Sequence, residues 1–202
     1  MSLDCERIVD EALSLLDEVG LDALSTRALA QRLGVKQPAL YWHFKSRRKL
    51  LDAMNDRILM LAHKNRAPRE DDTWDAFLWR VANSFRDALL SRRDGARIHA
   101  GTEATLDDLE PSERQLRFLV DAGFSATQAL DVLVAISRYT VGCVLEEQAE
   151  SERAPDPSLD EGAAHYPLLS VALEHYRRQG HTAAFEHGLN MLIRGAGPTG
   201  QA

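Results

Sequence analysis

The sequence predicts an all-α protein with a small three-helix N-terminal head and a larger helical body. Apolar residues recur at helical spacing along most of the 202 residues, and no stretch alternates apolar with polar residues as a half-buried strand would. Glycines end several of these segments, and serine or proline opens others. We expect a head over residues 1–48, a connecting helix over 49–66 and a body over 67–202.

The head is expected to begin with a helix over residues 4–19, because the apolar residues from Ile8 to Val19 fall on one helical face. Two short helices around a tight turn follow. Gly34 ends the first of them, where a left-handed residue is needed and glycine adopts that conformation without steric cost. Pro38 lies in the first turn of the next, where its missing N–H is no loss.

Charge is distributed unevenly along the chain, whose net charge is −7. Between Ala23 and Leu50 there are seven basic residues and no acidic one, whereas residues 51–202 carry 16 basic and 24 acidic side chains. An acidic body is repelled by phosphate, so the basic head would be turned toward nucleic acid. The two short helices and this field of one sign are typical of a helix-turn-helix, whose second helix enters a DNA major groove.

The rest of the chain also reads as helices. A long helix from Leu50 to about Lys64 connects head and body, and residues 67–72 form a linker. A polar segment over 149–162, with two prolines, predicts an irregular loop. The body helices are expected at about 73–92, 96–100, 112–121, 126–148, 166–178 and 182–194.

The helix over 126–148 is apolar on more than one face, as Leu130, Val134 and Val141 illustrate. Such a helix must be covered on both sides. The protein's own core can cover one side, and a second copy of the chain is the simplest cover for the other. We therefore expect a homodimer.

Composition indicates a soluble globular protein, with 45% hydrophobic and 27% charged residues. The cysteines, Cys5 and Cys143, are far apart and indicate neither a disulfide framework nor a CxxC metal site. The N-terminus is acidic where a signal peptide needs positive charge, and no uninterrupted apolar run reaches the roughly 18 residues that span a bilayer. We expect a cytoplasmic protein without a membrane partner.

Five segments resemble the tetracycline repressor (TetR) family. STRALAQRLGVKQPALYWHFKSRRKLLDA resembles the DNA-reading head of the family, while SFRDALLSRRDGARIHAGT, RQLRFL, AGFS and YTVGCVLEEQ resemble the ligand-binding core of the tetracycline repressors. The resemblance implies a homodimer built on a four-helix bundle, formed by the helix around Val141 and the last helix of each subunit. It implies a repressor that binds palindromic operator DNA and is released by a small-molecule effector, with a magnesium-chelating, tetracycline-like compound as the candidate.

The resemblance also implies which head residues contact DNA. Gln37 has the geometry to pair with an adenine edge, and Ala39 to contact a thymine methyl group. Tyr41, His43 and Lys45 suit phosphate binding, which sets register. The complete set is Thr26, Arg27, Gln37, Pro38, Ala39, Tyr41, Trp42, His43 and Lys45.

Two structural alternatives stay open in the head. Tyr41 and Trp42 could fill a small core instead of contacting DNA, because aromatic pairs often do so. Arg47, Arg48 and Lys49 could form a solvated surface.

In the body, the resemblance implies an effector pocket that includes a metal carried by the effector. His99 would bind Mg²⁺ directly, and Thr102 and Glu146 of the partner subunit would act through coordinated water. Mg²⁺ keeps several waters, so a site with one histidine works only if the effector chelates the ion as well. No intrinsic cofactor is expected. The implied ligand-binding residues are His63, Val81, Phe85, His99, Thr102, Glu103, Gln115, Ser137 and Arg138.

The sequence departs from the tetracycline repressor pattern in the pocket. Val81 stands where those repressors have an asparagine that hydrogen-bonds the drug, Glu103-Ala104 replace an Arg-Pro pair, and Arg138 replaces a histidine. Losing one buried hydrogen bond costs about 1–3 kcal/mol, or roughly tenfold or more in affinity. The effector therefore stays open between tetracycline and another polar, metal-chelating or aromatic compound.

Three other functions are alternatives to an effector-released repressor. An enzyme could use His63, His99 or Glu146 for acid–base or metal chemistry, but the chain has no nucleophile motif, HExxH or phosphate-binding loop, so we expect no enzyme. A regulator of the same fold could activate transcription or respond to an unrelated ligand. A protein that only sequesters a drug would have the body without DNA binding.

Overall fold

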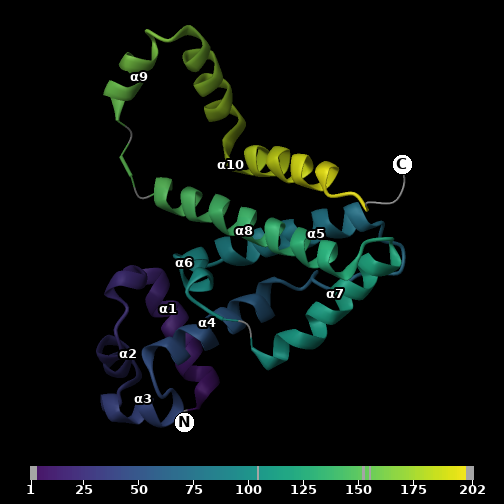
Figure 1. Cartoon of the computed structure of the whole chain (residues 1–202). Coiled ribbons are helices and arrows are strands. Elements are labelled where there is room, and N and C mark those ends of the chain that lie inside the picture. Colours follow the sequence, from purple (N-terminus) through teal and green to yellow (C-terminus); the bar gives the residue numbers. More distant parts are fainter. Residues whose placement is uncertain (1–3, 104, 152, 155, 199–202) are drawn as a thin grey trace.

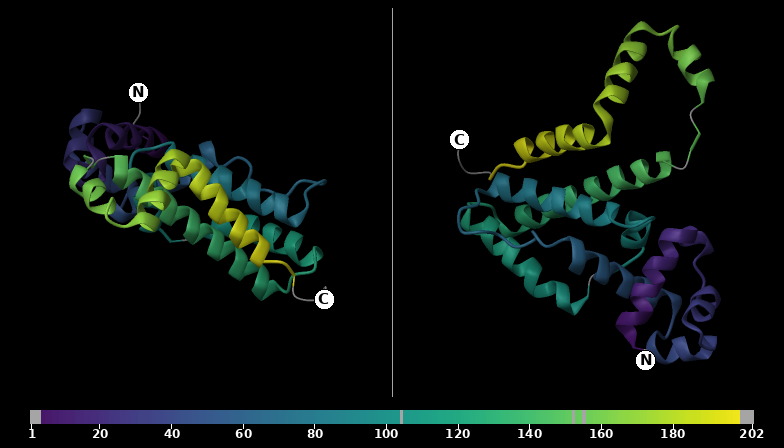
Figure 2. Two further views of the ribbon diagram at one scale, coloured as in Figure 1. Left: turned by 90° about the horizontal axis from the view of Figure 1, so that it is seen from above. Right: turned by 180° about the vertical axis from the view of Figure 1, so that it is seen from behind.

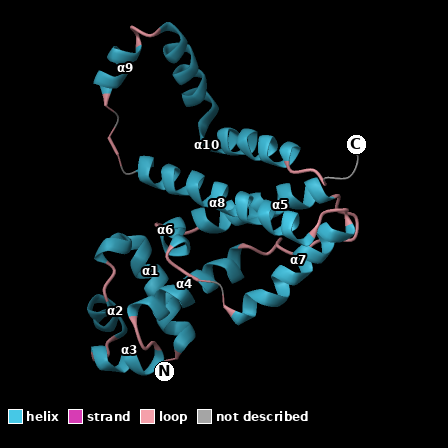
Figure 3. Ribbon diagram, in the orientation of Figure 1, coloured by secondary structure: helices cyan, strands magenta, loops and turns pink. Residues whose placement is uncertain are grey.

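The computed structural model describes residues 4–103, 105–151, 153–154 and 156–198. These residues form helices joined by loops, without any strand, which confirms the predicted all-α class (Figures 1 and 3). The elements in chain order are α1 (Cys5–Ala23), α2 (Thr26–Leu33), α3 (Gln37–His43), α4 (Arg47–Ala62), α5 (Trp74–Leu90), α6 (Gly95–Ala100), a 3₁₀ turn η1 (Leu106–Asp108), α7 (Leu109–Asp121), α8 (Ala126–Ser151), α9 (Pro157–Ala163) and α10 (Pro167–Gly195).

Capping residues set where the head helices begin and end. The Asp4 carboxylate accepts a hydrogen bond from the Arg7 N–H at the start of α1 (2.8 Å), and the Ser25 hydroxyl accepts one from the Ala28 N–H at the start of α2 (3.1 Å). Gly34 ends α2 with φ of 69°, the left-handed conformation predicted from the sequence. These caps hold α2 and α3 in the tight arrangement of a helix-turn-helix.

Helix α4 joins the head to the body through one continuous hydrophobic cluster. Leu50, Met54 and Ile58 on α4 are almost fully buried between head residues such as Leu16 and body residues such as Ile98. The helix packs against α1 on one side and against α5 and α6 on the other. A movement of the body that displaces α4 therefore also displaces the head.

Polar contacts also connect the end of α1 to the α5–α6 corner. The Leu21 N–H donates to the buried Asp94 carboxylate (2.7 Å), and Arg97 forms ion pairs with Asp22 (2.7 Å) and Asp94 (2.9 Å). Asp94 itself has a positive φ of 56°. The head is thus fastened to the body at α6 as well as along α4.

The body is layered around α5, which packs against α4 and α6 on one side and against α8 and α10 on the other (Figure 2). Its second core contains Phe77 and Leu78 of α5, Leu119 of α7, and Phe185 and Leu189 of α10. Aromatic rings interlock there, with the Phe77 ring centroid 4.9 Å from that of Phe118 on α7. The result is a rigid wall on one side of the space that α4, α6 and α7 enclose.

Several helix boundaries differ from the prediction. Helix α4 begins at Arg47, two to three residues early, because the Ser46 hydroxyl caps it by accepting from the Lys49 N–H (3.2 Å). Helix α7 begins at Leu109 instead of Ser112 because η1 leads directly into it.

One predicted C-terminal element is corrected: the expected loop over 149–162 contains α9, and α8 extends to Ser151. The two expected closing helices are confirmed, since α10 consists of two helical parts separated at Gly180, where φ is 73°. Gly20 likewise ends the main part of α1 in a non-helical conformation with φ of 77°, as predicted, and a short turn to Ala23 follows it.

Helix α8 is long and apolar enough to cross a membrane by length and composition alone, with a mean hydropathy of 1.3 over its most apolar window. In this fold it is a body helix that packs against α5, α6, α7 and α10, burying Ile136 and Val144. Other apolar side chains stay exposed in the single chain, among them Met191 and Leu192 on the neighbouring helix α10. A second copy would cover such a surface.

Helix α9 and the first part of α10 project away from the body (Figures 1 and 2). Large apolar side chains on this projection are exposed, including Leu168 at 89% and Val171 at 68%. The part of α10 after Gly180 returns to the body and packs on α5 and α8.

Replacing Gly188 with alanine is expected to lower the free energy of unfolding by about 1–3 kcal/mol, as overpacking does. A Cβ atom at this position would lie 2.0 Å from the Tyr139 hydroxyl oxygen, which is held in place by donating to the Phe185 carbonyl (3.0 Å). Urea denaturation followed by circular dichroism measures the change. Gly162→Ala in α9, where nothing lies within 4 Å of an added Cβ, is the control; an equal loss there would contradict the explanation.

Candidate DNA-reading helix and effector pocket

Helix α3 presents a polar and aromatic face to solvent. Leu40 is its buried residue, with 3% of its surface exposed, and it anchors α3 in the head core. Tyr41 is 47% exposed and Trp42 is 90% exposed, so this aromatic pair does not form part of that core. Pro38 is in the first turn, as predicted. The face opposite Leu40 is therefore open to a partner.

Two of the predicted DNA-contacting residues contact each other. The Gln37 side-chain amide donates to the Thr26 hydroxyl across the turn between α2 and α3 (2.8 Å). This bond orients Gln37 and leaves its carbonyl oxygen available as an acceptor. At the other end of α3, His43 Nδ1 lies 3.6 Å from Cys5 Sγ, which joins the helix end to α1. Both ends of α3 are thus tied to neighbouring helices.

The basic residues of the head divide into free and paired groups. Arg27, Lys36 and Lys45 are exposed and form no ion pair with any residue that the structure describes. Arg32, in contrast, pairs with Glu11 (2.9 Å) and Glu18 (2.7 Å) of α1. Arg32 therefore links α2 to α1. Because its charge is paired, it adds little to the positive field that the sequence predicts for the head.

The first turn of α4 carries the remaining basic residues of the head. Arg47 donates to the Leu21 carbonyl (3.1 Å), and Lys49 pairs with Asp52 (3.1 Å). Arg48 pairs with Glu103 (2.9 Å), a residue of the loop after α6. Each of these three side chains is thus bound within the protein, although all remain exposed.

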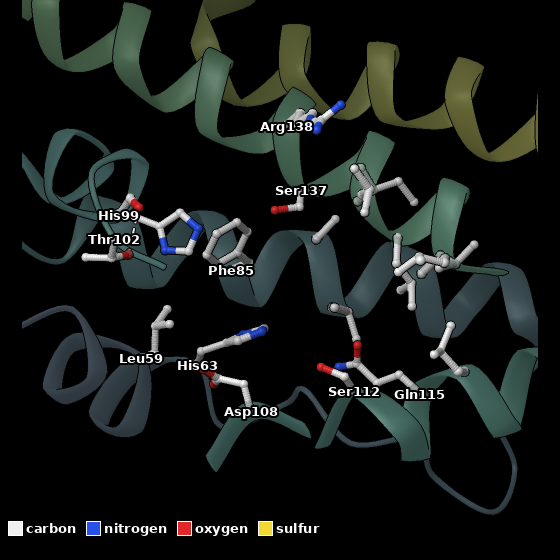
Figure 4. Close-up of a pocket in the computed structure, with 18 of the residues that line it drawn as sticks. Leu59, His63, Phe85, His99, Thr102, Asp108, Ser112, Gln115, Ser137 and Arg138 are labelled. Atoms are coloured by element: carbon white, nitrogen blue, oxygen red, sulfur yellow. Dashed lines mark hydrogen bonds between the residues drawn. The ribbon is translucent and has the colours of Figure 1, made fainter. Parts of the chain in front are cut away.

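A cavity of about 490 Å³ lies between α4, α5, α6, α7 and α8 (Figure 4). All nine residues predicted to bind the ligand line it, although they come from six separate segments of the chain. They are His63, Val81, Phe85, His99, Thr102, Glu103, Gln115, Ser137 and Arg138. Leu78, Leu116, Leu133 and Val134 supply much of its apolar wall.

Two histidines flank Phe85 at one end of this pocket. The Phe85 ring centroid lies 4.9 Å from that of His99, edge-on, and 5.6 Å from that of His63. His99 Nδ1 lies 3.0 Å from the Asn55 carbonyl oxygen on α4. That oxygen can only accept, so Nδ1 carries the proton and Nε2 keeps its lone pair. His99 is thus prepared to bind a metal ion through Nε2.

Burial keeps both histidines neutral at physiological pH. It lowers the pKa of His63 to about 4, and the positive charge of Arg66 acts in the same direction. Burial also lowers the pKa of His99, against the opposing charge of Asp108. A neutral imidazole is the form that binds metals and accepts hydrogen bonds.

Two further side chains are oriented by backbone carbonyls. The Thr102 hydroxyl donates to the His99 carbonyl (2.8 Å), so its oxygen lone pairs remain for a water or a ligand. The Gln115 amide donates to the Arg66 carbonyl (2.7 Å), which leaves its own oxygen as an acceptor. Figure 4 shows Gln115 and Ser112 extending from α7 toward the space below Ser137.

Three polar lining residues were not predicted from the sequence: Asn55, Asp108 and Ser112. Asn55 could have been predicted from the sequence as a pocket residue, because it is a polar residue beside Met54 on the apolar side of a helix; it is only 6% exposed. Asp108 could not have been predicted, since its position depends on how η1 turns. Its carboxylate accepts from the Thr105 N–H (2.8 Å) and hydroxyl (3.0 Å).

Two predicted features fall outside this pocket. Glu146 is exposed on α8 and does not line the cavity of its own chain, so any contact with the effector would have to come from the partner subunit. Ala104 lies outside the described residues. In the part of the chain that the structure describes, no three His, Cys, Asp or Glu side chains cluster as a metal site.

Comparison with known families matches both parts of the chain. Residues 8–54 match the model for bacterial regulatory proteins of the tetR family, and residues 67–197 match the tetracyclin repressor-like C-terminal domain. The chain belongs to the tetR family. As a tetR-family member it is a helix-turn-helix transcription regulator and not an enzyme, as the resemblance implied.

Curated relatives of this tetR-family protein include tetracycline repressors of Escherichia coli. The class A repressor from transposon 1721 is 50% identical over 189 residues, which cover 93% of this chain and 88% of the relative. The class C repressor is 49% identical over 197 residues, covering 96% and 90%.

Solved structures agree with this assignment. TetR(class A) in complex with 5a,6-anhydrotetracycline and magnesium has a TM-score of 0.77 at 45% identity, covering 96% of this chain and 98% of that chain. TetR from Acinetobacter baumannii AYE has a TM-score of 0.81 at 44% identity, covering 96% of both chains.

The low pKa of His63 predicts a loss of stability in mild acid. The unfolded imidazole binds a proton below its ordinary pKa of 6.5, whereas the folded one does so only near 4. Between these values the unfolded state holds more protons, so stability falls as the pH drops through this window. The full shift corresponds to about 3 kcal/mol, most of which is lost by about pH 4.5.

Urea unfolding at about pH 7 and about pH 4.5 measures this loss. His63→Gln, which keeps a polar partner for the Ser84 hydroxyl 3.0 Å away, should remove the part that His63 contributes and leave the part that comes from His99. His165→Gln changes an exposed histidine and should leave it intact. Equal pH dependence in all three proteins would contradict the explanation.

Proposed function

We propose that this chain is a TetR-type transcriptional repressor that acts in the cytoplasm, binds palindromic operator DNA as a homodimer and is released by a small-molecule effector. The observation that supports this proposal most directly is that helix α4 takes part in both the DNA-binding head and the effector pocket of the body. Its Leu50 and Met54 are in the core shared with the head. Its Asn55 lines the effector pocket, as does His63, the residue at its C-terminal cap.

On DNA, each head of the dimer would place α3 in a major groove. Two heads spaced about 34–36 Å apart then read successive half-sites of a palindrome. Gln37, oriented by Thr26, would read an adenine edge, and Ala39 a thymine methyl group. Lys45 and the exposed Tyr41 would bind phosphate and fix the register.

The dimer would form through α8 and the last part of α10 from each subunit. The exposed apolar side chains Met191 and Leu192, neighbours on α10, support this arrangement, because large apolar groups left uncovered next to one another mark interaction surfaces. The arrangement would also bring Glu146 of the partner subunit toward the pocket.

We infer that the effector is a tetracycline-like compound that carries Mg²⁺. The identities near 50% with tetracycline repressors support this class. His99 fits the role of direct ligand, since it is neutral and its Nε2 is available. Thr102 and Glu146 of the partner subunit would hold coordinated waters, and the effector's own oxygens would supply the remaining ligands that a hard cation needs.

Release would follow from the contact between His99 and Asn55. A ligand on His99 Nε2 changes the position of α6, and the 3.0 Å bond from Nδ1 passes this change to α4. If the effector binds better to the dimer whose heads are wrongly spaced, operator binding weakens by the same coupling free energy.

The lining residues also favour a variant of this proposal in which the effector differs from tetracycline. Val81 removes a hydrogen-bonding group from the pocket wall, and Arg138 places a guanidinium at its edge. Such a wall suits an effector with a less polar edge and an anionic group near Arg138.

Gln37→Ala is expected to weaken operator binding by about 1–3 kcal/mol per contact and to relax specificity at one position of each half-site. Lys45→Gln should weaken binding to all sequences alike. It should also lower the slope of log K against log salt concentration by about one per head. Fluorescence anisotropy with a duplex selected from random palindromes measures both. Lys64→Gln, an exposed lysine beyond the head, is the matched control. Failure of the wild type to bind any palindrome would favour a drug-sequestering protein.

Val81→Asn is expected to raise the affinity for tetracycline with Mg²⁺ about tenfold, because it restores one buried hydrogen bond. Val81→Leu, which restores none, should not. Fluorescence titration of the drug measures both. A wild type that gives no signal at micromolar drug while still binding its operator would remove tetracycline as the effector and leave the repressor intact.

A further inference from the structure

A second cavity, of about 400 Å³, lies at the junction of head and body. Most of its α4 residues differ from those of the effector pocket: Ala53, Asp56 and Met60 line this cavity, Asn55 lines the effector pocket, and Leu59 lines both. Its remaining walls come from the start of α1, from the residue after α3 and from the turn η1. Head, connecting helix and body thus each contribute to it.

The inner part of this junction cavity is apolar. Val9 of α1 is 5% exposed and forms part of the head core, and Phe44 packs against the same core. Ala53 is small, which leaves room beside α4. Met60 is 57% exposed although it lines the cavity, so a large apolar side chain is left uncovered at the opening.

The opposite wall is acidic. Asp56 of α4 faces Asp107 and Asp108 of η1, and all three line the cavity. Burial, followed by repulsion from Asp108 and Asp52, raises the pKa of Asp56. These carboxylates therefore lie close enough to disfavour one another's charge, and a cation placed between them would relieve that repulsion.

The two arginines that line the cavity do not neutralise this wall. Arg57 is engaged by Glu6 (2.9 Å) and Asp10 (2.9 Å) of α1. Arg66 lines the cavity as well, and its charge also lowers the pKa of His63. The lining holds four carboxylates, those of Glu6, Asp56, Asp107 and Asp108, against these two arginines, so it is acidic on balance.

We propose that the junction cavity binds an amphipathic organic cation, with its apolar part against Val9, Phe44 and Met60 and its charged group beside Asp56 and Asp107. The combination of an apolar floor and an acidic wall selects this class over anions, which the carboxylates repel, and over neutral compounds, which gain no charge contact. The cation would contact the head and the body at once. The site shares Leu59 and Asp108 with the effector pocket but is otherwise lined by different residues, and the proposal does not depend on the effector's identity.

The test titrates the full-length protein with phenyltrimethylammonium and, separately, with tert-butylbenzene, which has the same shape without the charge. Isothermal titration calorimetry or ligand-observed NMR gives both affinities. We expect the cation to bind about fivefold more tightly or better, the effect of one carboxylate contact in a high-dielectric site. Asp56→Asn should lower the cation's affinity by a similar factor. Asp121→Asn, an exposed carboxylate on α7 outside the cavity, should not change it.

Methyl NMR locates the bound cation. The methyl signals of Ala53 and Met60 should shift on titration, while those of Val81 and Leu133 in the effector pocket should not. Ala53→Leu fills the cavity and should abolish these shifts, with circular dichroism confirming the fold. Equal affinity for the neutral compound, an unaltered affinity in Asp56→Asn, shifts confined to the effector pocket or the absence of cation binding at millimolar concentration would each overturn the proposal.

Discussion

The burial of α4 between two sets of neighbours is the constraint on which the rest of the structure depends. Leu50 and Met54 complete a core begun by α1, while Ile58 continues that core toward α6. Side chains in a close-packed core do not deform continuously, so α4 moves with both parts or exchanges one packing for another. The polar ties between Leu21 and Asp94 strengthen the same junction. A shift of α4 at the pocket can therefore reach α3 through the packing of α4 on α1, of α1 on α2 and of α2 on α3.

The effector pocket is organised by the low dielectric around its two histidines. Burial makes the charged imidazolium unfavourable, so the pocket holds His63 and His99 as neutral groups with defined hydrogen-bond partners, Ser84 and Asn55. The same low dielectric strengthens the interaction between a bound cation and its ligands. An effector without a metal would leave the Nε2 lone pair of His99 without a partner in apolar surroundings. This cost would favour effectors that carry a metal ion.

Sequence predicted the parts of this structure that local rules govern. Gly34 and Pro38 placed the helix-turn-helix correctly because their backbone preferences are intrinsic. The nine pocket residues were assigned through the family resemblance, and no spacing rule would have assembled them from six segments. Helix α9 was missed because its segment is polar and proline-rich. Asp108 was missed because its position depends on η1, a tertiary feature that no periodicity reveals.

Dimerisation and effector binding are linked if Glu146 of the partner subunit completes the metal site. In a single chain the proposed site would have His99 and Thr102 alone, and Mg²⁺ binds weakly to so few protein groups. A subunit interface formed by α8 would bring the third group, so the effector would bind the dimer better than the monomer. Reciprocity would then require the effector to stabilise the dimer by the same free energy. On this proposal, the exposed apolar side chains of α10 and the metal site that one chain leaves incomplete would follow from one requirement, that the working unit contains two chains.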